Sequence, residues 1–502
     1  MAATSSPPTR PEAETARDVR QAAALSFGHA AAMVLGGVLA LLIAQFFGRS
    51  ARTDAFFAAY GVYTVALVLA QTFRLTAIPR LVRDRDGSVA DSLLGAIAVL
   101  AALAAVPMIL LAEPFGKVLV ANDPAGVAAE SLRSLWPALA GQLLVGLLAA
   151  FLIVRGRFVV IAAGYLVGGL VSVAILAAFQ EDVGIQAVSL ALAISVAVIA
   201  TLFVVSLVRA GWRPRARAVL DVRAAPRQAG SLVIASASFL AANLGFVICV
   251  AVASRDGAGE ATIYAYAYFA AALLVATTAV SSAMVRTPKL IAGADRTEAV
   301  ITEATTTYRF TLVLVGPALG LVAVAGAPIA DFLLGGAFDD ASAERLVVTL
   351  LCLSGWVLGS AAAVFAIVDL LARGRQAALA AVAVSQLVLL VPLAITGRAV
   401  AGVEGVAVAQ SVALLAATWV QLRLAFGQRT PATIASMLAT TLRAAAVMAI
   451  AFAPGIAIAL ASDGSTAATA AAIAISLPLA FVATRLAWPA ETKTILSLLP
   501  GR

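Results

Sequence analysis

Residues 155–209 read RGRFVVIAAGYLVGGLVSVAILAAFQEDVGIQAVSLALAISVAVIATLFVVSLVR, which is two long apolar runs joined by a short polar turn. The runs cover residues 158–179 and 185–208, and each reaches the roughly 20 apolar residues that a helix needs to cross a bilayer. A segment inside lipid must satisfy its own backbone hydrogen bonds, which a helix does. The stretch therefore predicts a transmembrane helical hairpin.

The same pattern fills the rest of the chain. Further apolar ranges lie at 21–47, 54–78, 89–112, 127–154, 228–252, 261–285, 307–333, 345–372, 375–396, 404–426, 434–461 and 466–488. We therefore predict an all-α integral membrane protein with 14 transmembrane helices. The composition agrees, because 62% of the residues are hydrophobic and 12% are charged, against about a quarter charged in soluble domains.

The positive charges predict the orientation of these helices. If the residues before the first span are cytoplasmic, 25 of the 34 Lys and Arg residues fall on that side, seven on the other and two inside spans. This asymmetry follows the positive-inside rule. We therefore expect a multi-pass protein of the bacterial inner (plasma) membrane with both termini in the cytoplasm. The net charge of +8 is explained by these loops, which argues against nucleic acid as a partner.

An internal repeat appears at an offset of 218 residues. The sequence Arg-Gly-Arg occurs at 155–157 and again at 373–375, and Gly184-Ile185 is matched by Gly402-Val403. Helices six spans apart insert in the same orientation, so we predict two pseudo-symmetric six-helix lobes with a cleft between them. The predicted organisation is a disordered tail 1–20, an N-terminal lobe 21–208, a basic linker 209–227, a C-terminal lobe 228–430, two extra helices in 431–490 and a tail 491–502. The linker is either a short interfacial helix or a solvated segment.

The sequence gives no sign of an enzyme. The predicted loops are too short for a folded catalytic domain, and no nucleotide-binding or metalloprotease motif is present. His29 is the single histidine, and Cys249 and Cys352 fall within predicted helices, so no metal site or cofactor is expected.

Charged and polar residues inside the predicted spans are candidate cavity residues, because burying them in hydrocarbon is costly. Arg74, close to Gln71 in the second span, and Arg286, at the end of the eighth, would form a cationic mouth for a phosphate group if both point inward. Snorkelling to the headgroups is the alternative for both arginines.

Neutral polar residues have two interpretations each. His29 and Asn243 either bond neighbouring helices or contact substrate. Tyr60 and Tyr268, at comparable places in the two lobes, either belong to an aromatic belt or line a sugar-binding cleft. Acidic residues are expected near helix ends, with none at the bilayer midplane, which argues against cation-driven export.

One hairpin carries a family resemblance. Residues 48–57 read GRSARTDAFF, and the second span closes with Ile-Pro-Arg-Leu at 78–81. This hairpin resembles that of the MurJ (MviN) lipid II flippases of the multidrug/oligosaccharidyl-lipid/polysaccharide (MOP) exporter superfamily. The resemblance implies fourteen spans arranged as six, six and two, and a functional role for Asp54. It also implies cavity arginines, but the first span has none, and Leu67 and Phe269 stand at the other two positions.

These observations lead to one main hypothesis and two alternatives. We expect a flippase that moves a polyprenyl-(pyro)phosphate-linked cell-envelope glycan precursor, lipid II or a relative, to the outer leaflet. The resemblance also implies the bilayer and proteins of cell-wall synthesis as partners. The alternatives are a small-molecule exporter like the multidrug and toxin extrusion (MATE) proteins, and a membrane scaffold that has lost transport.

Overall fold

The computed structural model describes residues 35–83, 88–120, 123, 126–213, 215, 224–280, 296–334, 338–462 and 465–497. Every regular element in these ranges is a helix, and the ranges contain no strand, which confirms the all-α prediction. Ten of the helices are long and apolar enough to cross a membrane. The count of fourteen remains a prediction, because one of these ten ranges, Gln376–Ala461, covers three expected spans.

The first half of the chain contains α2 (Ala51–Arg83), α3 (Ser88–Leu110), α4 (Ala112–Leu119), α5 (Val127–Val154), α6 (Phe158–Val183), α7 (Gln186–Arg209) and α9 (Ala224–Ala235). The hairpin predicted from residues 155–209 is thus formed by α6 and α7. The second half contains α10 (Ala237–Ala253), α11 (Glu260–Val275), the π-helical turn η2 (Ala276–Val280), α13 (Arg296–Leu334), α14 (Asp340–Cys352), α15 (Ser354–Ala372), α16 (Gln376–Phe426), η3 (Gly427–Arg429), α17 (Thr430–Ala461), α18 (Thr466–Ala487) and α19 (Pro489–Ser497).

These helices group into two compact units. Unit 1 comprises Met1–Ile43, Val62–Pro114 and Ala129–Ser236, and unit 2 comprises Ala44–Gly61, Phe115–Ala128 and Ala237–Arg502. The predicted lobe boundaries at 208, 228 and 430 remain predictions.

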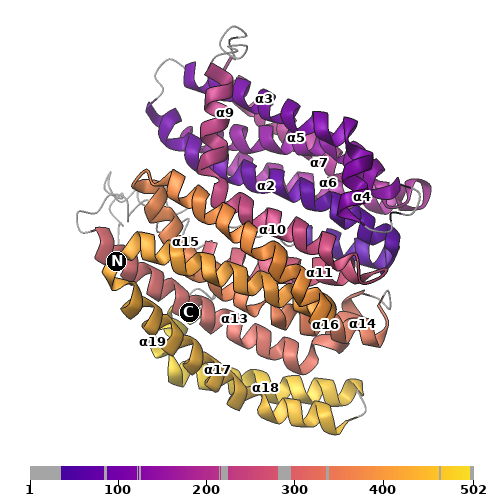
Figure 1. Ribbon diagram of the computed structural model, residues 1–502, viewed down its shortest axis with the longest axis vertical. Coiled ribbons are helices and arrows are strands. Elements are labelled where there is room, and N and C mark those ends of the chain that lie inside the picture. The colour runs from indigo at the N-terminus through magenta and orange to yellow at the C-terminus, as the bar shows by residue number, and fades with distance from the viewer. Residues whose placement is uncertain are drawn as a thin grey trace, which may run out of the picture. The chain divides into compact units, whose positions relative to one another are not determined.

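In unit 1, α6 packs along α7 and α3 packs against α9 (Figure 1). Glycine makes the first of these contacts close: a Cβ at Gly164 would meet Phe203 at 2.5 Å, and a Cβ at Gly168 would meet Ile199 at 2.4 Å. Small residues of this kind let transmembrane helices approach each other, since lipid provides no hydrophobic force between them.

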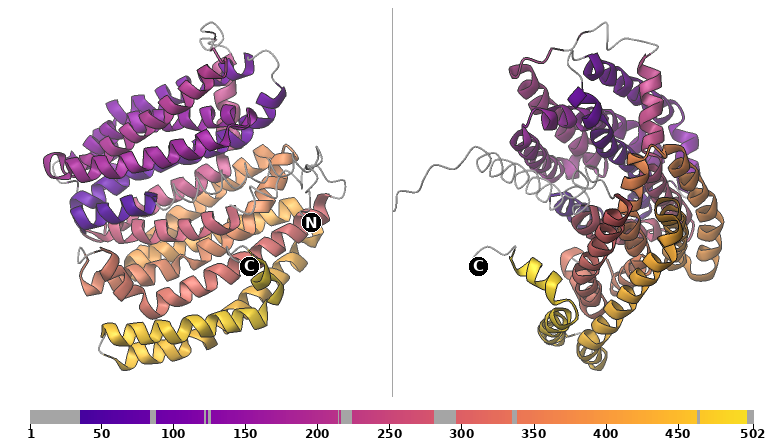
Figure 2. Two further views of the ribbon diagram at one scale, coloured as in Figure 1. Left: turned by 180° about the vertical axis from the view of Figure 1, so that it is seen from behind. Right: turned by 90° about the vertical axis from the view of Figure 1, so that its left-hand side faces the viewer.

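In unit 2, α16 packs against α10 and α15, and α13, α17 and α18 pack against one another, with α17 and α18 in yellow near the C-terminus (Figure 2). A buried cluster containing Phe365, Leu370 and Phe426 joins α15 and α16. A second cluster around Phe452 joins α17 to α13 and α18.

Equivalent residues of the 218-residue repeat make the same local contacts and adopt the same backbone conformation. Arg157 Nη1 donates to the Ser206 carbonyl oxygen at 3.4 Å, and Arg375 Nη1 donates to the Leu424 carbonyl oxygen at 3.2 Å. The matched glycines also agree: φ and ψ are 62° and −142° at Gly184, and 57° and −139° at Gly402. Gly402 interrupts α16 between the predicted eleventh and twelfth spans.

Candidate functional site

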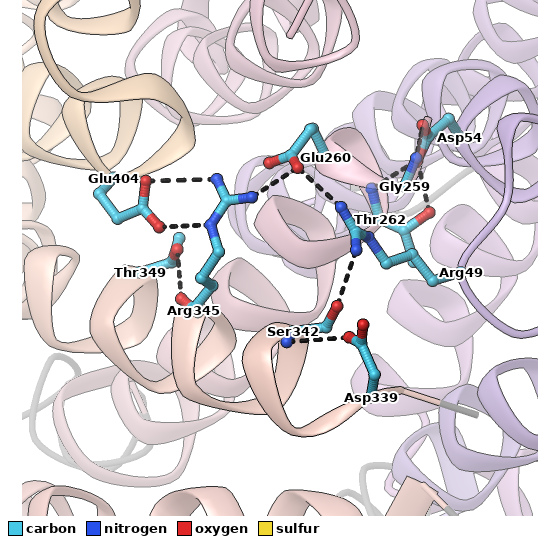
Figure 3. Close-up of polar contacts among 10 residues, drawn as sticks. All are labelled: Arg49, Asp54, Gly259, Glu260, Thr262, Asp339, Ser342, Arg345, Thr349 and Glu404. Atoms are coloured by element: carbon cyan, nitrogen blue, oxygen red, sulfur yellow. Dashed lines mark hydrogen bonds and ion pairs between the residues drawn. The ribbon is translucent and has the colours of Figure 1, made fainter. Parts of the chain in front are cut away.

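Asp54 lies in the first turn of α2 and caps α11, a helix more than 200 residues away in the sequence (Figure 3). Its Oδ2 accepts the backbone N–H of Gly259 at 2.5 Å. Its Oδ1 accepts the backbone N–H of Thr262 at 2.7 Å and the Thr262 hydroxyl at 2.6 Å. The first N–H groups of a helix have no partner within that helix and carry positive partial charge, so a carboxylate satisfies both needs.

Glu260 starts α11 and binds two arginines. Arg49 Nη2 lies 2.7 Å and Arg345 Nη1 lies 2.6 Å from the same oxygen, Glu260 Oε1. Arg345 also binds Glu404, with Nε to Oε1 at 3.0 Å and Nη2 to Oε2 at 3.5 Å. The chain Arg49, Glu260, Arg345, Glu404 therefore alternates in charge and links residues 44–61 with α11, α14 and α16 (Figure 3). We call these four residues together with Asp54 the polar cluster.

Arg49 also contacts the first turn of α14. Asp339 is the N-cap of α14 and accepts the Ser342 backbone N–H at 3.0 Å, while the Ser342 hydroxyl accepts Arg49 Nη1 at 2.7 Å. Hydrogen bonding to Ser342 lowers the pKa of the exposed Asp339 carboxyl. The negative charge therefore stays at the end of α14 that faces Arg49.

The break in α16 at Gly402 lies next to the polar cluster. A Cβ at Gly402 would lie 3.6 Å from Asp256 and Glu404 side-chain oxygens and 3.8 Å from Arg345 Nη2. Arg398, one turn earlier, donates from Nε to Asp256 Oδ1 at 2.8 Å. The bend at Gly402 thus brings two ion pairs close together, Arg398–Asp256 from the first half of α16 and Arg345–Glu404 from the second half.

The polar cluster is buried to different degrees. The side chain of Glu260 is 7% exposed, whereas those of Arg49 and Arg345 are 26% and 37% exposed. Glu260 Oε2 is buried and accepts no hydrogen bond from any described residue. Water can reach the arginines, so these contacts hold the helix ends together with only a moderate net free energy.

An aromatic cluster in unit 2 contains two of the predicted site residues. Tyr60 stacks on Phe56 with ring centroids 5.8 Å apart, and Tyr268 stacks on Phe246 at 4.5 Å. Phe269 contacts both tyrosines, at 5.8 Å and 6.3 Å, so the two side chains belong to one packed group of rings. Whether either tyrosine contacts a sugar remains a prediction.

The other predicted site residues are not brought to the polar cluster. Asn243 lies on α10 with a half-buried side chain. Arg74 and Gln71 lie on α2, but their side chains are outside the described part of the structure, as are His29 and Arg286 entirely. The cationic mouth therefore remains a prediction.

Four members of the polar cluster were not expected from the sequence. Arg49 and Arg345 are two of the seven Lys and Arg residues on the predicted outer side, Glu404 is one of the acidic residues near predicted helix ends, and nothing in the sequence singles out Glu260. The available signal was the small number of basic residues on the predicted outer side, seven of the 34 Lys and Arg residues. The described residues hold no group of acidic, His and Cys side chains arranged for a metal ion.

No protein-family model and no curated sequence matches the chain. Solved structures do match. An inward closed structure of the lipid II flippase MurJ is 16% identical, with a TM-score of 0.72 over 93% of this chain and 98% of that one. An inward-facing multidrug resistance MATE transporter of the MOP superfamily is 15% identical, with a TM-score of 0.61 over 82% of this chain and 95% of that one. A MATE protein in complex with MaL6 is 14% identical, with a TM-score of 0.60 over 85% of this chain and 96% of that one. The chain is thus a multi-pass membrane protein with the fold of MurJ and the MATE transporters of the MOP superfamily.

Proposed function

We propose that this protein is a flippase that moves a polyprenyl-(pyro)phosphate-linked glycan precursor of the cell envelope across the bacterial inner membrane by alternating access. Lipid II or a related lipid-linked glycan is the substrate. The observation that carries the proposal is the polar cluster, a set of charged side chains that joins residues 44–61 to α11, α14 and α16.

The polar cluster has the properties of a closed outer gate. It joins residues 44–61 to α11, α14 and α16 at the end that the charge distribution predicts to be periplasmic. Its bonds are ionic and partly exposed, so they can be exchanged for water at modest cost, unlike interdigitated apolar packing. Opening this end and closing the cytoplasmic end would release a headgroup that entered from the inside.

A lipid-linked substrate is favoured over a small cation by the placement of acidic residues. In the part of the chain that the structure describes, the buried acids are Asp54, Asp91, Glu260 and Asp369. Each lies in the first or last turn of its helix. Cation-coupled exchange usually needs a carboxylate nearer the bilayer middle. The greater coverage by the MurJ structure than by the MATE transporters supports the same choice.

The test is translocation in proteoliposomes that contain the purified protein and lipid II. A membrane-impermeant reagent that modifies the glycan reports its arrival in the opposite leaflet. We expect wild-type protein to accelerate arrival and Glu260→Gln to slow it, because the two arginines then face each other without their shared carboxylate. Glu113→Gln is the matched control, since Glu113 pairs with Arg133 in the open, at 70% and 47% exposure. Arrival at the rate of protein-free liposomes would contradict the proposal.

A MATE-like small-molecule exporter is the second candidate, favoured by the TM-scores of 0.61 and 0.60 to MATE structures. Efflux of organic cations driven by a proton or sodium gradient, without lipid II movement, would support it. A scaffold without transport would show neither activity and would tolerate Arg74→Ala and Arg286→Ala.

A further inference from the structure

Arg443 has an unexpected position for a charged residue inside a predicted span. It lies on α17, well within the predicted thirteenth span, and its side chain is exposed. Its guanidinium carbon lies 5.5 Å from the centroid of the Trp488 ring. Trp488 directly follows the last residue of α18 and is 5% exposed.

This contact fixes the depth of Arg443. The 22 residues of α18 give a helix about 33 Å long, close to the roughly 30 Å of a hydrocarbon core. Trp488 therefore stands at the boundary of the bilayer, where tryptophan is enriched, and Arg443 stands there with it. Arg443 is consequently an interfacial residue and not one at the membrane centre.

A second arginine shares this boundary. Arg485 is in the last turn of α18, three residues before Trp488, and its side chain is also exposed. No hydrogen bond or ion pair from any described residue engages either guanidinium. The cation–π contact with Trp488 uses none of the N–H donors of Arg443 in a hydrogen bond, so they can bind oxygen atoms of a ligand.

The neighbouring surface is apolar. Leu442 is 62% exposed and Leu486 is 77% exposed, and each is adjacent in sequence to one of the arginines. Exposed leucines beside arginines at this depth match a lipid, whose acyl chains and phosphate lie side by side. A soluble anion would bind the arginines but would have no use for the leucines.

We propose that Arg443, Arg485 and Trp488 form a binding site for the phosphate headgroup of an anionic phospholipid, in the leaflet that the charge distribution predicts to be cytoplasmic. The two guanidinium groups bind the phosphate oxygens, and the exposed leucines contact the acyl chains. The site is separate from the polar cluster and does not depend on the transport proposal.

Native mass spectrometry of the purified protein, titrated with phosphatidylglycerol or phosphatidylcholine, tests the site. We expect wild type to retain phosphatidylglycerol more strongly than phosphatidylcholine. Each of Arg443→Ala and Arg485→Ala should weaken phosphatidylglycerol binding about five-fold, and the double variant about 25-fold. Inorganic phosphate should not displace the lipid.

Arg209→Ala is the matched control, because Arg209 is an exposed arginine at the end of α7, also predicted to be cytoplasmic, with no aromatic neighbour among the described ring contacts. It should leave phosphatidylglycerol binding within about two-fold of wild type. Arg443→Lys keeps the charge, so it should bind better than Arg443→Ala and thereby separates loss of the site from poor folding. Equal binding by wild type, the double variant and the control would overturn the proposal, as would binding of polyprenyl phosphate but not phosphatidylglycerol.

Discussion

Asp54 Oδ1 accepts two hydrogen bonds from Thr262, one from the backbone amide at 2.7 Å and one from the hydroxyl at 2.6 Å. One side chain near the start of α2 thus holds the first turn of α11. A single substitution at Asp54 should therefore destabilise the start of α11.

Asp54→Asn should lower the unfolding free energy by about 2–3 kcal/mol, because two backbone N–H groups lose a charged acceptor and Asn offers one acceptor oxygen in place of two. Thr262→Val should cost about 1 kcal/mol, since it removes the hydroxyl bond and keeps both backbone bonds. Denaturant unfolding in detergent micelles measures both. Equal losses in the two variants would show that the negative charge of Asp54 contributes nothing.

Glu260→Gln should lower the unfolding free energy by about 3 kcal/mol, the lower end of the range for breaking a buried ion pair, because the two arginines keep partial access to water. Glu404→Gln should cost about 1 kcal/mol, because its partner Arg345 keeps Glu260 and both side chains are partly exposed. Thermal unfolding of the two variants under identical conditions gives the order. A larger loss for Glu404→Gln would contradict the central position of Glu260.

Gly259→Ala should lower the free energy of unfolding by more than backbone strain alone explains, because the added Cβ would also displace Arg49 of the polar cluster. Gly259 has a φ of +88°, and an added Cβ would lie 2.1 Å from Arg49 Cγ. Gly211→Ala is the control, because Gly211 has a φ of +85° with nothing within 4 Å of an added Cβ. The control should lose about 1 kcal/mol, and Gly259→Ala about 2 kcal/mol or more. Similar unfolding midpoints for the two variants would mean that Arg49 moves aside freely.

The repeated glycines should respond alike. Gly184 and Gly402 share a backbone conformation that residues with a Cβ rarely adopt, so Gly184→Ala and Gly402→Ala should each cost about 1–3 kcal/mol. Gly230→Ala, inside α9 with open space around the added Cβ, should instead stabilise the protein by about 0.4–1 kcal/mol. Unfolding measurements that give the same sign for all three variants would contradict this explanation.

Much of the fold could be predicted from the sequence because its signals are local. A run such as 158–179 is long and apolar enough to form a spanning helix wherever it lies, and Gly184 and Gly402 carry the same turn in both copies of the repeat. The resemblance in residues 48–57 singled out Asp54, although it said nothing of the helix that Asp54 caps. Arg443 shows the limit of the same approach, because a hydropathy window places it inside a span but does not reveal its contact with Trp488, 45 residues further along the chain.

The sequence by itself therefore determined that this is a polytopic helical membrane protein, and it determined the register of the internal repeat. These properties follow from hydrophobicity, glycine conformation and charge within a few tens of residues. Only the tertiary structure decided that Arg49, Glu260, Arg345 and Glu404 meet, because their ion pairs join positions 59 to 211 residues apart. Coulomb attraction acts through space and leaves no periodic trace in the sequence, so packing of the helices alone brings these charges within bonding distance.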